Sequence, residues 1–396
     1  MMRIAYISET FLPKIDGISN TLCRLLEHLY LRGHQSVMFA PQGAPPIYAN
    51  TPILQPISIP FPLYPELKIA NPFTNLDRHL AKFQPDLIHV VNPFSIGVAG
   101  TRYARLNHIP LVASYHTDIP GYSTRYYGLP FMTHLIWDYF RWVHNQADLT
   151  LCPSQSTLQE LDKKGFKNLK LWSRGVDLEK FAPSKSSPEW RWGISAGRPE
   201  TVILLYVGRL AAEKRVEWLL PVIQSIPYAH LVIVGDGPMR EDLQALFKGT
   251  NTTFTGYLQG EDLARAYASS DIFVFPSANE TFGNVVLEAM ASGLPVVAPR
   301  SGGVMDSVID GETGLLFESD RQEDLVSSVL KIITDPRALW RMGSAARQAA
   351  SKRGWNGVLD HLIDDYQLTI NQQQYQKIRR ANPVRTTYQK LPFWLE

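Results

Sequence analysis

Two glutamates near the start of one helix are the side chains whose spacing most clearly suggests ligand binding. The segment Phe275–Gly293 reads FPSANETFGNVVLEAMASG, in which a strand ends at Phe275 and a helix is expected to begin near Phe282. Glu280 lies just ahead of this helix and Glu288 about two turns into it. Glu288 could accept hydrogen bonds from a ribose, while Glu280 would face a sugar. The alternative is that Glu280 caps the helix and Glu288 is a solvated surface acid.

The start of the same helix is a candidate anion site. Backbone N–H groups in the first turn of a helix have no intrahelical partner and point toward a ligand. Here they belong to Phe282, Gly283 and Asn284. We therefore expect a phosphate to bind at this point without a charged side chain.

An arginine and a lysine follow a second strand, the one that ends at Val207. Arg209 comes at the strand end and Lys214 about one helical turn later. A guanidinium fork with an ammonium point charge suits a diphosphate and the charge on a leaving group, although two such residues are more often ordinary surface charges. No D-x-D occurs in the chain, so we expect fixed cations rather than a bound metal to hold the diphosphate.

Two glycine turns complete this half of the candidate site. The turn VGDGP around Gly235 lacks the third glycine of a dinucleotide fingerprint, because Arg240 stands in its place, and NAD binding is therefore not expected. Thr255-Gly256-Tyr257 ends the next strand, and its backbone could contact a nucleobase.

The first half of the chain supplies fewer candidates. Gly17 allows the turn after the first strand to approach a ligand closely, and the neighbouring Asp16 could orient an acceptor hydroxyl. His116 and Asp118 follow another strand end in SYHTDIPGY. A single histidine is more often structural than catalytic.

These residues must be positioned by two sets of strands that alternate with helix-length segments. In the first half the strands are expected at residues 3–8, 35–40, 87–91, 111–114 and 149–152, and in the second at 201–207, 230–234, 252–255, 272–275 and 295–298. This alternation predicts parallel, doubly wound α/β sheets that bind ligands at the carboxyl ends of their strands. The Ser-, Pro- and Gly-rich segment Ala182–Glu200 reads as a linker. We therefore expect domains over residues 1–182 and 183–354, followed by a C-terminal segment over 355–396.

Composition restricts the function classes. At 396 residues, with 45% apolar and 19% charged residues, the chain fits two globular domains. A net charge of +2 gives no indication of nucleic-acid binding, and two distant cysteines favour a reducing compartment. We expect neither a signal peptide nor a membrane span, and hence a cytoplasmic protein with at most peripheral membrane contact.

The pattern E-x-F-G-x-V-x-x-E-A-M-A-S-G-x-P-V-V resembles the donor signature of retaining glycosyltransferases of family 4. That family has the GT-B fold, two facing Rossmann-like domains. Further stretches, among them SYHTDIPGY, LWSRGVD, VGRLAAEK and FTGYLQGEDLARAYASSD, extend the resemblance over most of residues 1–350. The resemblance implies that the first domain binds the acceptor and that the second binds a nucleotide-diphosphate sugar, with no further cofactor.

The resemblance also implies roles for individual residues. Catalytic roles fall on His116, Arg209, Lys214 and Glu280, of which His116 would lie beside the transferred sugar. Acceptor binding falls on Asp16 and Asp118. Donor binding falls on Gly17, Arg209, Lys214, Gly235, Tyr257, Glu280, Phe282, Gly283, Asn284, Val285 and Glu288.

Retention of configuration is expected from the same resemblance. Double displacement would need a carboxylate nucleophile beneath the sugar ring, and no carboxylate in the chain has a secure position there. The hypothesis is therefore a front-face reaction, in which the leaving phosphate takes the acceptor proton while Arg209, Lys214 and the helix amides stabilise its charge.

Within the family the chain looks closest to sulfoquinovosyl-diacylglycerol synthases, which transfer sulfoquinovose from a UDP donor to diacylglycerol. A neighbouring group, GDP-mannose-dependent α-mannosyltransferases acting on glycolipids, shares much of the pattern. Phe282 and its neighbours depart from the leucines expected around the glycine in the sulfolipid enzymes, which bears on the donor sugar. A non-catalytic nucleotide-sugar binder, a GT-B epimerase and a phosphorylase are rival interpretations.

Both groups imply a lipid acceptor. Aromatic residues are dense in Pro60–Phe73 and Tyr122–Trp142, although core packing explains them equally well. The C-terminal segment is expected to cross back to the first domain as a helix over part of Trp355–Ile370. Beyond it, the tail Gln372–Glu396 combines five basic residues with Phe393 and Trp394, a composition that suits either an anionic membrane or a disordered, solvated tail.

Overall fold

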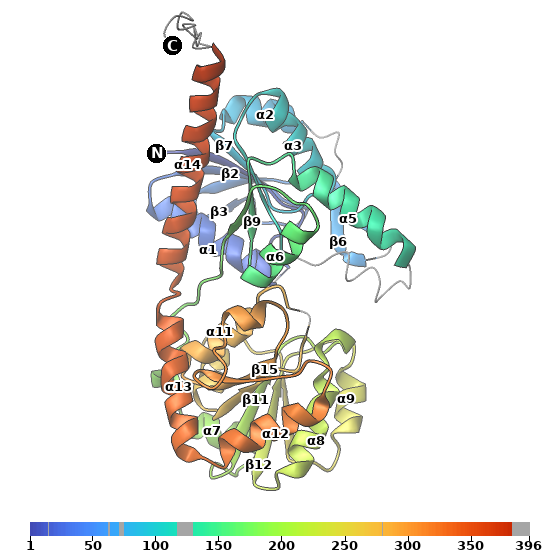
Figure 1. Ribbon diagram of the computed structural model, residues 1–396, viewed down its shortest axis with the longest axis vertical. Coiled ribbons are helices and arrows are strands. Elements are labelled where there is room, and N and C mark those ends of the chain that lie inside the picture. The colour runs from blue at the N-terminus through green and yellow to red at the C-terminus, as the bar shows by residue number, and fades with distance from the viewer. Residues whose placement is uncertain (15, 62–63, 71–74, 117–129, 279, 382–396) are drawn as a thin grey trace, which may run out of the picture.

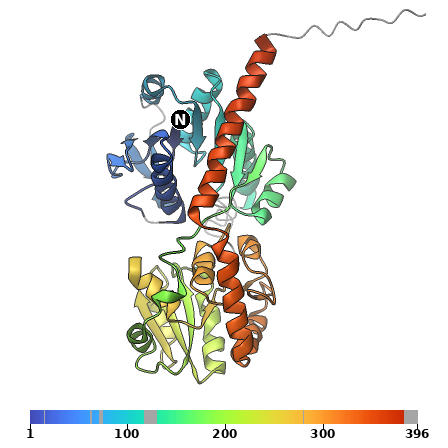
Figure 2. The same cartoon turned by 90° about the vertical axis from the view of Figure 1, so that its left-hand side faces the viewer.

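A computed structural model describes residues 1–14, 16–61, 64–70, 75–116, 130–278 and 280–381 of the chain. Two α/β domains lie one above the other, and a long C-terminal helix runs along the side of the first (Figures 1 and 2). The predicted fold class, two domains with doubly wound parallel sheets, is confirmed.

The first domain is built on an eight-stranded sheet with the order β10-β9-β8-β7-β1-β2-β4-β3, in which all neighbours are parallel except β3 and β4. The strands are β1 (Arg3–Ile7), β2 (Gln35–Phe39), β3 (Ile47–Tyr48), β4 (Thr51–Leu54), β7 (Leu87–Val90), β8 (Leu111–Ser114), β9 (Leu149–Cys152) and β10 (Leu169–Leu171). The helices are α1 (Gly17–Leu31), α2 (Leu76–Phe83), α3 (Ser95–Leu106), α5 (Pro130–His144) and α6 (Gln155–Lys163). A separate antiparallel ribbon joins β5 (Ser58–Phe61) to β6 (Tyr64–Ala70).

The second domain is built on a six-stranded parallel sheet with the order β13-β12-β11-β14-β15-β16. The strands are β11 (Val202–Val207), β12 (Ala229–Val234), β13 (Thr252–Gly256), β14 (Ile272–Val274), β15 (Val296–Pro299) and β16 (Gly314–Phe317). The α-helices are α7 (Pro188–Ile194), α8 (Leu219–Ser225), α9 (Arg240–Leu246), α10 (Gly260–Ala268), α11 (Asn284–Ala291), α12 (Gln322–Ile333) and α13 (Pro336–Ser351). The 3₁₀ turns are η1 (Pro183–Lys185), η2 (Ala212–Lys214), η3 (Val216–Trp218) and η4 (Gly302–Asp306).

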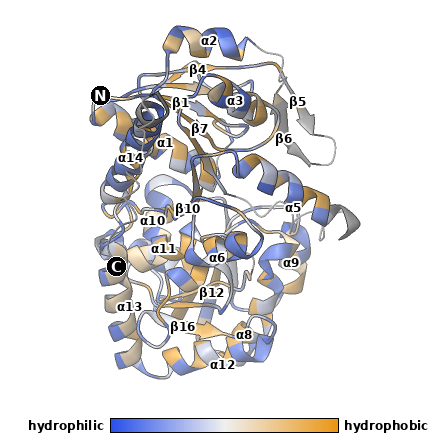
Figure 3. Cartoon of the chain, turned by 45° about the horizontal axis from the view of Figure 1, so that its top comes forward, coloured by the Kyte–Doolittle hydropathy of each residue, from blue (hydrophilic) through white to orange (hydrophobic). Residues whose placement is uncertain are grey.

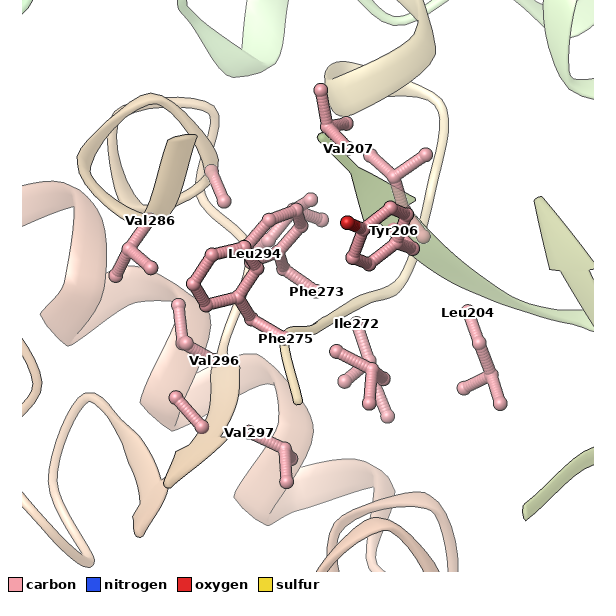
Figure 4. Packing of buried hydrophobic residues seen from close by; sticks show 14 of the residues in the cluster. Leu204, Tyr206, Val207, Ile272, Phe273, Phe275, Val286, Leu294, Val296 and Val297 are labelled. Atoms are coloured by element: carbon pink, nitrogen blue, oxygen red, sulfur yellow. The ribbon is translucent and has the colours of Figure 1, made fainter. Parts of the chain in front are cut away.

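Both sheets are buried on their two faces, which is why their strands read as continuous apolar runs rather than as alternating ones. Colouring by hydropathy shows the apolar strands inside and polar residues on the outer helices (Figure 3). In the second domain, Tyr206 and Phe275 are stacked with ring centroids 6.2 Å apart, and Phe273 and Phe275 with centroids 5.8 Å apart (Figure 4). This core fixes the strand ends that carry the candidate residues.

The last helix, α14 (Trp355–Ala381), packs against the first domain after the chain has left the second. Leu359, Leu362 and Tyr366 are buried in one apolar cluster with residues of β1 and α1. Asp360 pairs with His28 of α1 and with Arg32, which directly follows that helix, and Asp365 pairs with Lys170 of β10. The helix thus joins the second domain to the back of the first.

Two local predictions were wrong. The segment Ala182–Glu200 is not a linker but contains η1 and α7, because Ser187 caps α7 and Ile194 is buried in the second core. The helix expected to begin near Phe282 begins at Asn284, because Gly283 adopts a left-handed conformation with φ of 83° and ends the preceding loop.

Candidate active site

The donor-side candidates follow adjacent strands of one parallel sheet. Arg209 follows β11, Gly235 follows β12, Tyr257 follows β13 and Glu280 follows β14, and these four strands are neighbours in the sheet. The carboxyl ends of parallel strands meet at one edge, where open α/β sheets bind ligands. The sequence spacing therefore brings four distant segments to the same edge of the second domain.

Lys214 and Glu280 form an ion pair at this edge. The ammonium lies 2.5 Å from Glu280 Oε1, which also accepts a hydrogen bond of 2.9 Å from the hydroxyl of Ser277. Both charged side chains are mostly buried, with 18% and 16% exposed. The pair presents one fixed cation and one fixed anion to whatever binds beside it.

Arg209 is exposed at the mouth of β11. Its carbonyl oxygen accepts a hydrogen bond of 3.1 Å from Tyr206, and the next N–H, of Leu210, donates to Asp236 O at 2.9 Å. Gly235 permits this close approach, since a Cβ there would lie 1.9 Å from Gly208 O. The guanidinium is thus carried by a loop that the adjacent β12 turn holds in place.

Glu288 lies on α11 with its carboxylate turned to the interior of the second domain. Its Oε2 accepts a hydrogen bond of 3.0 Å from the buried Tyr267 hydroxyl. Burial raises the pKa of Glu288 to about 7, against the opposing effects of Tyr267 and the Lys180 ammonium. Near neutral pH, Glu288 therefore changes between hydrogen-bond acceptor and hydrogen-bond donor.

Two helix N-termini, one from each domain, approach each other. Gly17 is the first residue of α1 and Asn284 the first of α11, and a Cβ on Gly17 would lie 2.9 Å from Asn284 Nδ2. Asn284 Oδ1 is buried and has no hydrogen-bond partner among the described residues. Phe282 and Gly283 are buried just ahead of α11, and Val285 is its second residue. The two helix starts therefore lie side by side at the contact between the domains.

Of the two acceptor-side candidates, Asp16 and Asp118, the structure describes only Asp16. Asp16 caps α1, and its Oδ1 accepts from the N–H groups of Ile18 at 3.0 Å and Ser19 at 2.8 Å, so this oxygen already has a local structural role. Asp118 lies outside the described residues. Its predicted role, like those of the other candidates, stays a prediction.

His116 has both ring nitrogens engaged by the protein. Nε2 lies 2.7 Å from Ser114 Oγ and Nδ1 lies 2.9 Å from the Arg174 guanidinium. Burial, followed by the charge of Arg174, lowers the pKa of His116 well below its usual range. The carbonyl oxygen of His116 accepts a hydrogen bond of 3.1 Å from Thr281, which belongs to the second domain. In this arrangement the imidazole offers no nitrogen to a substrate.

Four residues that shape the site were not predicted from the sequence. Ser277 and Thr281 flank Glu280, Tyr267 bonds to Glu288, and Arg174 bonds to His116. For Arg174 a signal existed, because it follows β10 and so lies at the carboxyl edge of the first sheet. No feature of the sequence pointed to Tyr267, because its partner Glu288 lies 21 residues away on another helix.

Neither a metal centre nor a membrane-spanning helix is found among the residues that the structure describes. No group of three or more His, Cys, Asp or Glu side chains could hold a metal ion there. No helix in the same part of the chain is long and apolar enough to cross a membrane.

Comparison with known families covers both domains. The model of "Glycosyltransferase Family 4" matches residues 15–180, and that of "Glycosyl transferases group 1" matches residues 201–335. Sulfoquinovosyl transferase SQD2 of Arabidopsis thaliana is 34% identical over 98% of this chain and 78% of its own length. A GDP-mannose-dependent alpha-mannosyltransferase of Mycolicibacterium smegmatis is 38% identical over 93% of this chain and 98% of its own length.

Solved structures agree on the fold. Sucrose-phosphate synthase from Thermosynechococcus elongatus matches with a TM-score of 0.76 at 23% identity, covering 93% of this chain and 99% of that one. Anabaena HepE in complex with UDP matches with a TM-score of 0.76 at 18% identity, covering 92% and 99%. The two facing domains are thus a GT-B fold, and the chain belongs to glycosyltransferase family 4, as an enzyme that uses a nucleotide-sugar donor.

Proposed function

We propose that this enzyme transfers sulfoquinovose from UDP-sulfoquinovose to diacylglycerol with retention of the anomeric configuration. The observation that carries the proposal is the similarity to SQD2, named as a sulfoquinovosyl transferase, over 98% of this chain. Relatives named as alpha-monoglucosyldiacylglycerol synthases, 26–27% identical, support a diacylglycerol acceptor. Transfer of mannose from GDP-mannose is the second candidate, favoured by three relatives of that name at 36–38% identity.

The donor would lie along the carboxyl edge of the second sheet. Arg209 and Lys214 would hold the diphosphate, the start of α11 would add backbone N–H groups, and Glu288 would accept hydrogen bonds from the ribose. Tyr257, 56% exposed beyond β13, would lie beside the base. The pairing of Lys214 with Glu280 supports this arrangement, because it keeps the ammonium at the site with no ligand present.

The reaction would proceed on the front face of the sugar. As the bond between the anomeric carbon and the diphosphate lengthens, charge grows on the leaving oxygen, and Arg209, Lys214 and the α11 amides would stabilise it. The acceptor hydroxyl would pass its proton to that oxygen and bond to the anomeric carbon on the same face. Glu280 would face the transferred sugar. Since fixed cations carry the charge, we expect the reaction to need no metal ion.

Product formation tests the proposal. Purified enzyme would be given vesicles containing diacylglycerol or a glycolipid, with UDP-sulfoquinovose, UDP-glucose and GDP-mannose supplied separately, each with and without chelator. Sulfolipid formed only from the first donor, with an α linkage and undiminished by chelator, is the expected result. A mannolipid would replace the first candidate by the second. Loss of product with chelator would contradict metal independence.

We also propose that the C-terminal tail contacts an anionic membrane. Lys377 lies at the end of α14, and Arg385, Lys390 and Trp394 belong to residues 382–396, outside the described part of the chain. Basic residues beside an aromatic residue favour an anionic surface by ~1 kcal/mol per charge. A chain ending at Tyr375, which lacks all five basic residues of the tail, should sediment less with anionic vesicles and bind donor as before. Equal sedimentation of both chains would remove the tail from the proposal.

A further inference from the structure

A buried series of hydrogen bonds runs from the C-terminal helix to the contact between the two domains. Tyr366 of α14 has its hydroxyl 2.6 Å from His89 Nδ1 on β7. His89 Nε2 lies 2.9 Å from the hydroxyl of Ser114, at the end of β8, and that hydroxyl lies 2.7 Å from His116 Nε2. Tyr366, His89 and Ser114 are each at most 1% exposed, so water does not compete with these bonds.

The contact with Arg174 fixes the direction in which hydrogen bonds are donated along this series. A guanidinium can only donate, so His116 Nδ1, 2.9 Å from Arg174 Nη2, must accept. A neutral imidazole that accepts at Nδ1 carries its hydrogen on Nε2 and donates it to Ser114. The Ser114 hydroxyl then donates to His89 Nε2, which leaves His89 with its hydrogen on Nδ1, directed at the Tyr366 oxygen.

Donation in the opposite direction is not possible, because Arg174 can only donate to His116. If Tyr366 donated to His89 and His89 to Ser114, the serine would donate to His116 Nε2. His116 would then have to accept at both nitrogens, which a neutral imidazole cannot do.

The surroundings keep both imidazoles neutral. Burial lowers the pKa of His89 to about 3 and that of His116 well below its usual range, and the Arg174 charge acts in the same direction on both. Arg174 is itself buried, with its Nη1 bonded to Trp172 O at 2.9 Å. Within the described part of the chain it has no carboxylate at ion-pair distance. A second positive charge on His116 would therefore be strongly disfavoured.

The other end of the series reaches the donor loop. The carbonyl of His116 accepts the Thr281 hydroxyl at 3.1 Å, and Thr281 directly follows Glu280. On the far side of the same loop, Gly303 N–H donates to Glu280 O at 2.7 Å. The loop that carries Glu280 is thus held between Gly303 of its own domain and the backbone carbonyl of His116, whose side chain is linked to α14 through Ser114 and His89.

We propose that Tyr366 and His89 are positioning residues for sugar transfer, which through Ser114 and His116 hold the Glu280 loop at the domain contact. The inference rests on the proposed function, in which Glu280 faces the transferred sugar. It assigns to α14, the last helix of the chain, a part in turnover beyond joining the domains.

Two matched variants separate positioning from packing. Tyr6 is as buried as Tyr366, and its hydroxyl donates only to Tyr366, at 3.3 Å. Tyr6→Phe therefore removes that bond alone, while Tyr366→Phe removes it together with the bond to His89. We expect Tyr366→Phe to lower kcat about tenfold, since small displacements of reacting groups cost large factors, with the Kd for nucleotide unchanged. Tyr6→Phe should stay within about twofold of the parent.

Nitrogen NMR shows which ring nitrogen of each histidine is protonated, a property that a loss of packing alone would not change. In the parent, His89 should be protonated on Nδ1 only and His116 on Nε2 only. In Tyr366→Phe, Ser114 still donates to His89 Nε2, so His89 should stay protonated on Nδ1, and the signal of that N–H should shift because its acceptor is lost. In Ser114→Ala, which frees His89 Nε2, His89 should populate both tautomers. Ser114→Ala, which interrupts the series at its centre, should lower kcat as Tyr366→Phe does. It is the alternative test variant if Tyr366→Phe does not fold.

The outcomes separate this inference from the proposed function. Active parent enzyme with equal kcat in Tyr366→Phe and Tyr6→Phe, or His116 protonated on Nδ1, overturns the inference and leaves the function standing. Absence of transfer by the parent from any donor overturns the proposed function, whatever tautomers the spectra show.

Discussion

The Lys214–Glu280 ion pair brings together two residues from loops 66 positions apart. Alone, such a mostly buried pair is weak evidence for stability, because the cost of removing both charges from water offsets their attraction. In the proposed function, the pair keeps an ammonium beside Glu280 at the carboxyl edge of the sheet, where a diphosphate would bring two negative charges. Ser277 remains bonded to Glu280 when the lysine is removed, so the carboxylate keeps a partner.

Replacement of Lys214 tests the role of that ammonium. Lys214→Ala should lower kcat about 10²-fold to 10³-fold, because a fixed charge aimed at the leaving group is lost. Thermal unfolding should change little. Lys248→Ala, at an exposed lysine after α9, is the matched control and should retain full activity. Near-normal turnover by Lys214→Ala would contradict the assigned role.

The proposed role of Glu288 at the ribose predicts that donor binding depends on pH. With a pKa of about 7, the carboxylate would accept ribose hydroxyls above pH 7 and would be protonated below it, so affinity should rise with pH through that value. Tyr267→Phe removes a hydrogen bond that favours the charged form, so the midpoint should move upward. Calorimetry should use a nucleotide sugar, since a free terminal phosphate ionises near pH ~6. Glu288→Gln should abolish the dependence, and a persisting midpoint near 7 would exclude Glu288 as its source.

At the scale of elements, the strands were predictable because each is buried on both faces and reads as an apolar run. The start of α11 was misplaced, because nothing in the apolar periodicity shows that Gly283 takes a left-handed conformation. The same periodicity could not show that α7 is folded, since its stability comes from long-range contacts, such as Arg191 with Asp271 at 2.8 Å. The placement of Arg209 and Glu280 at one sheet edge followed from the parallel topology, whereas the grouping of both with Lys214 as a donor site was implied by the family resemblance.

The approach of α1 to α11 can be tested by a double-mutant cycle. Gly17→Ala adds a methyl group that would meet Asn284 Nδ2 at 2.9 Å, so the amide must rotate away. We expect kcat/KM to fall about tenfold, ~1.4 kcal/mol, with no loss of thermal stability, since alanine suits a helix. In the Asn284→Ala background, Gly17→Ala should have no further effect. Additive losses would show that the two helix starts act independently.

At the scale of the whole molecule, the chain crosses between the domains twice, and the two crossings lie side by side. Val176 N–H donates to Arg353 O at 2.9 Å, and Arg347 donates to Phe181 O at 2.9 Å. Closer to the site, the carboxylate of Asp306 on η4 accepts the N–H of Gln155, the first residue of α6 in the other domain. The crossings form a joint, while Asp306 and Thr281 hold the domains together across the site.

Asp306→Asn should therefore shift the enzyme toward an open arrangement. The main-chain oxygen of residue 306 keeps its bond to Arg353, so the substitution removes the negative charge at the start of α6 and its attraction to the Arg353 guanidinium. A loss of ~1 kcal/mol would change the opening equilibrium about fivefold. Small-angle scattering should show a larger radius of gyration without donor, with a higher KM and unchanged unfolding. Asp262→Asn, which alters only an ion pair within α10, is the control. Identical scattering by both variants would mean that Asp306 does not hold the domains together, and that closure rests on Thr281 and the joint.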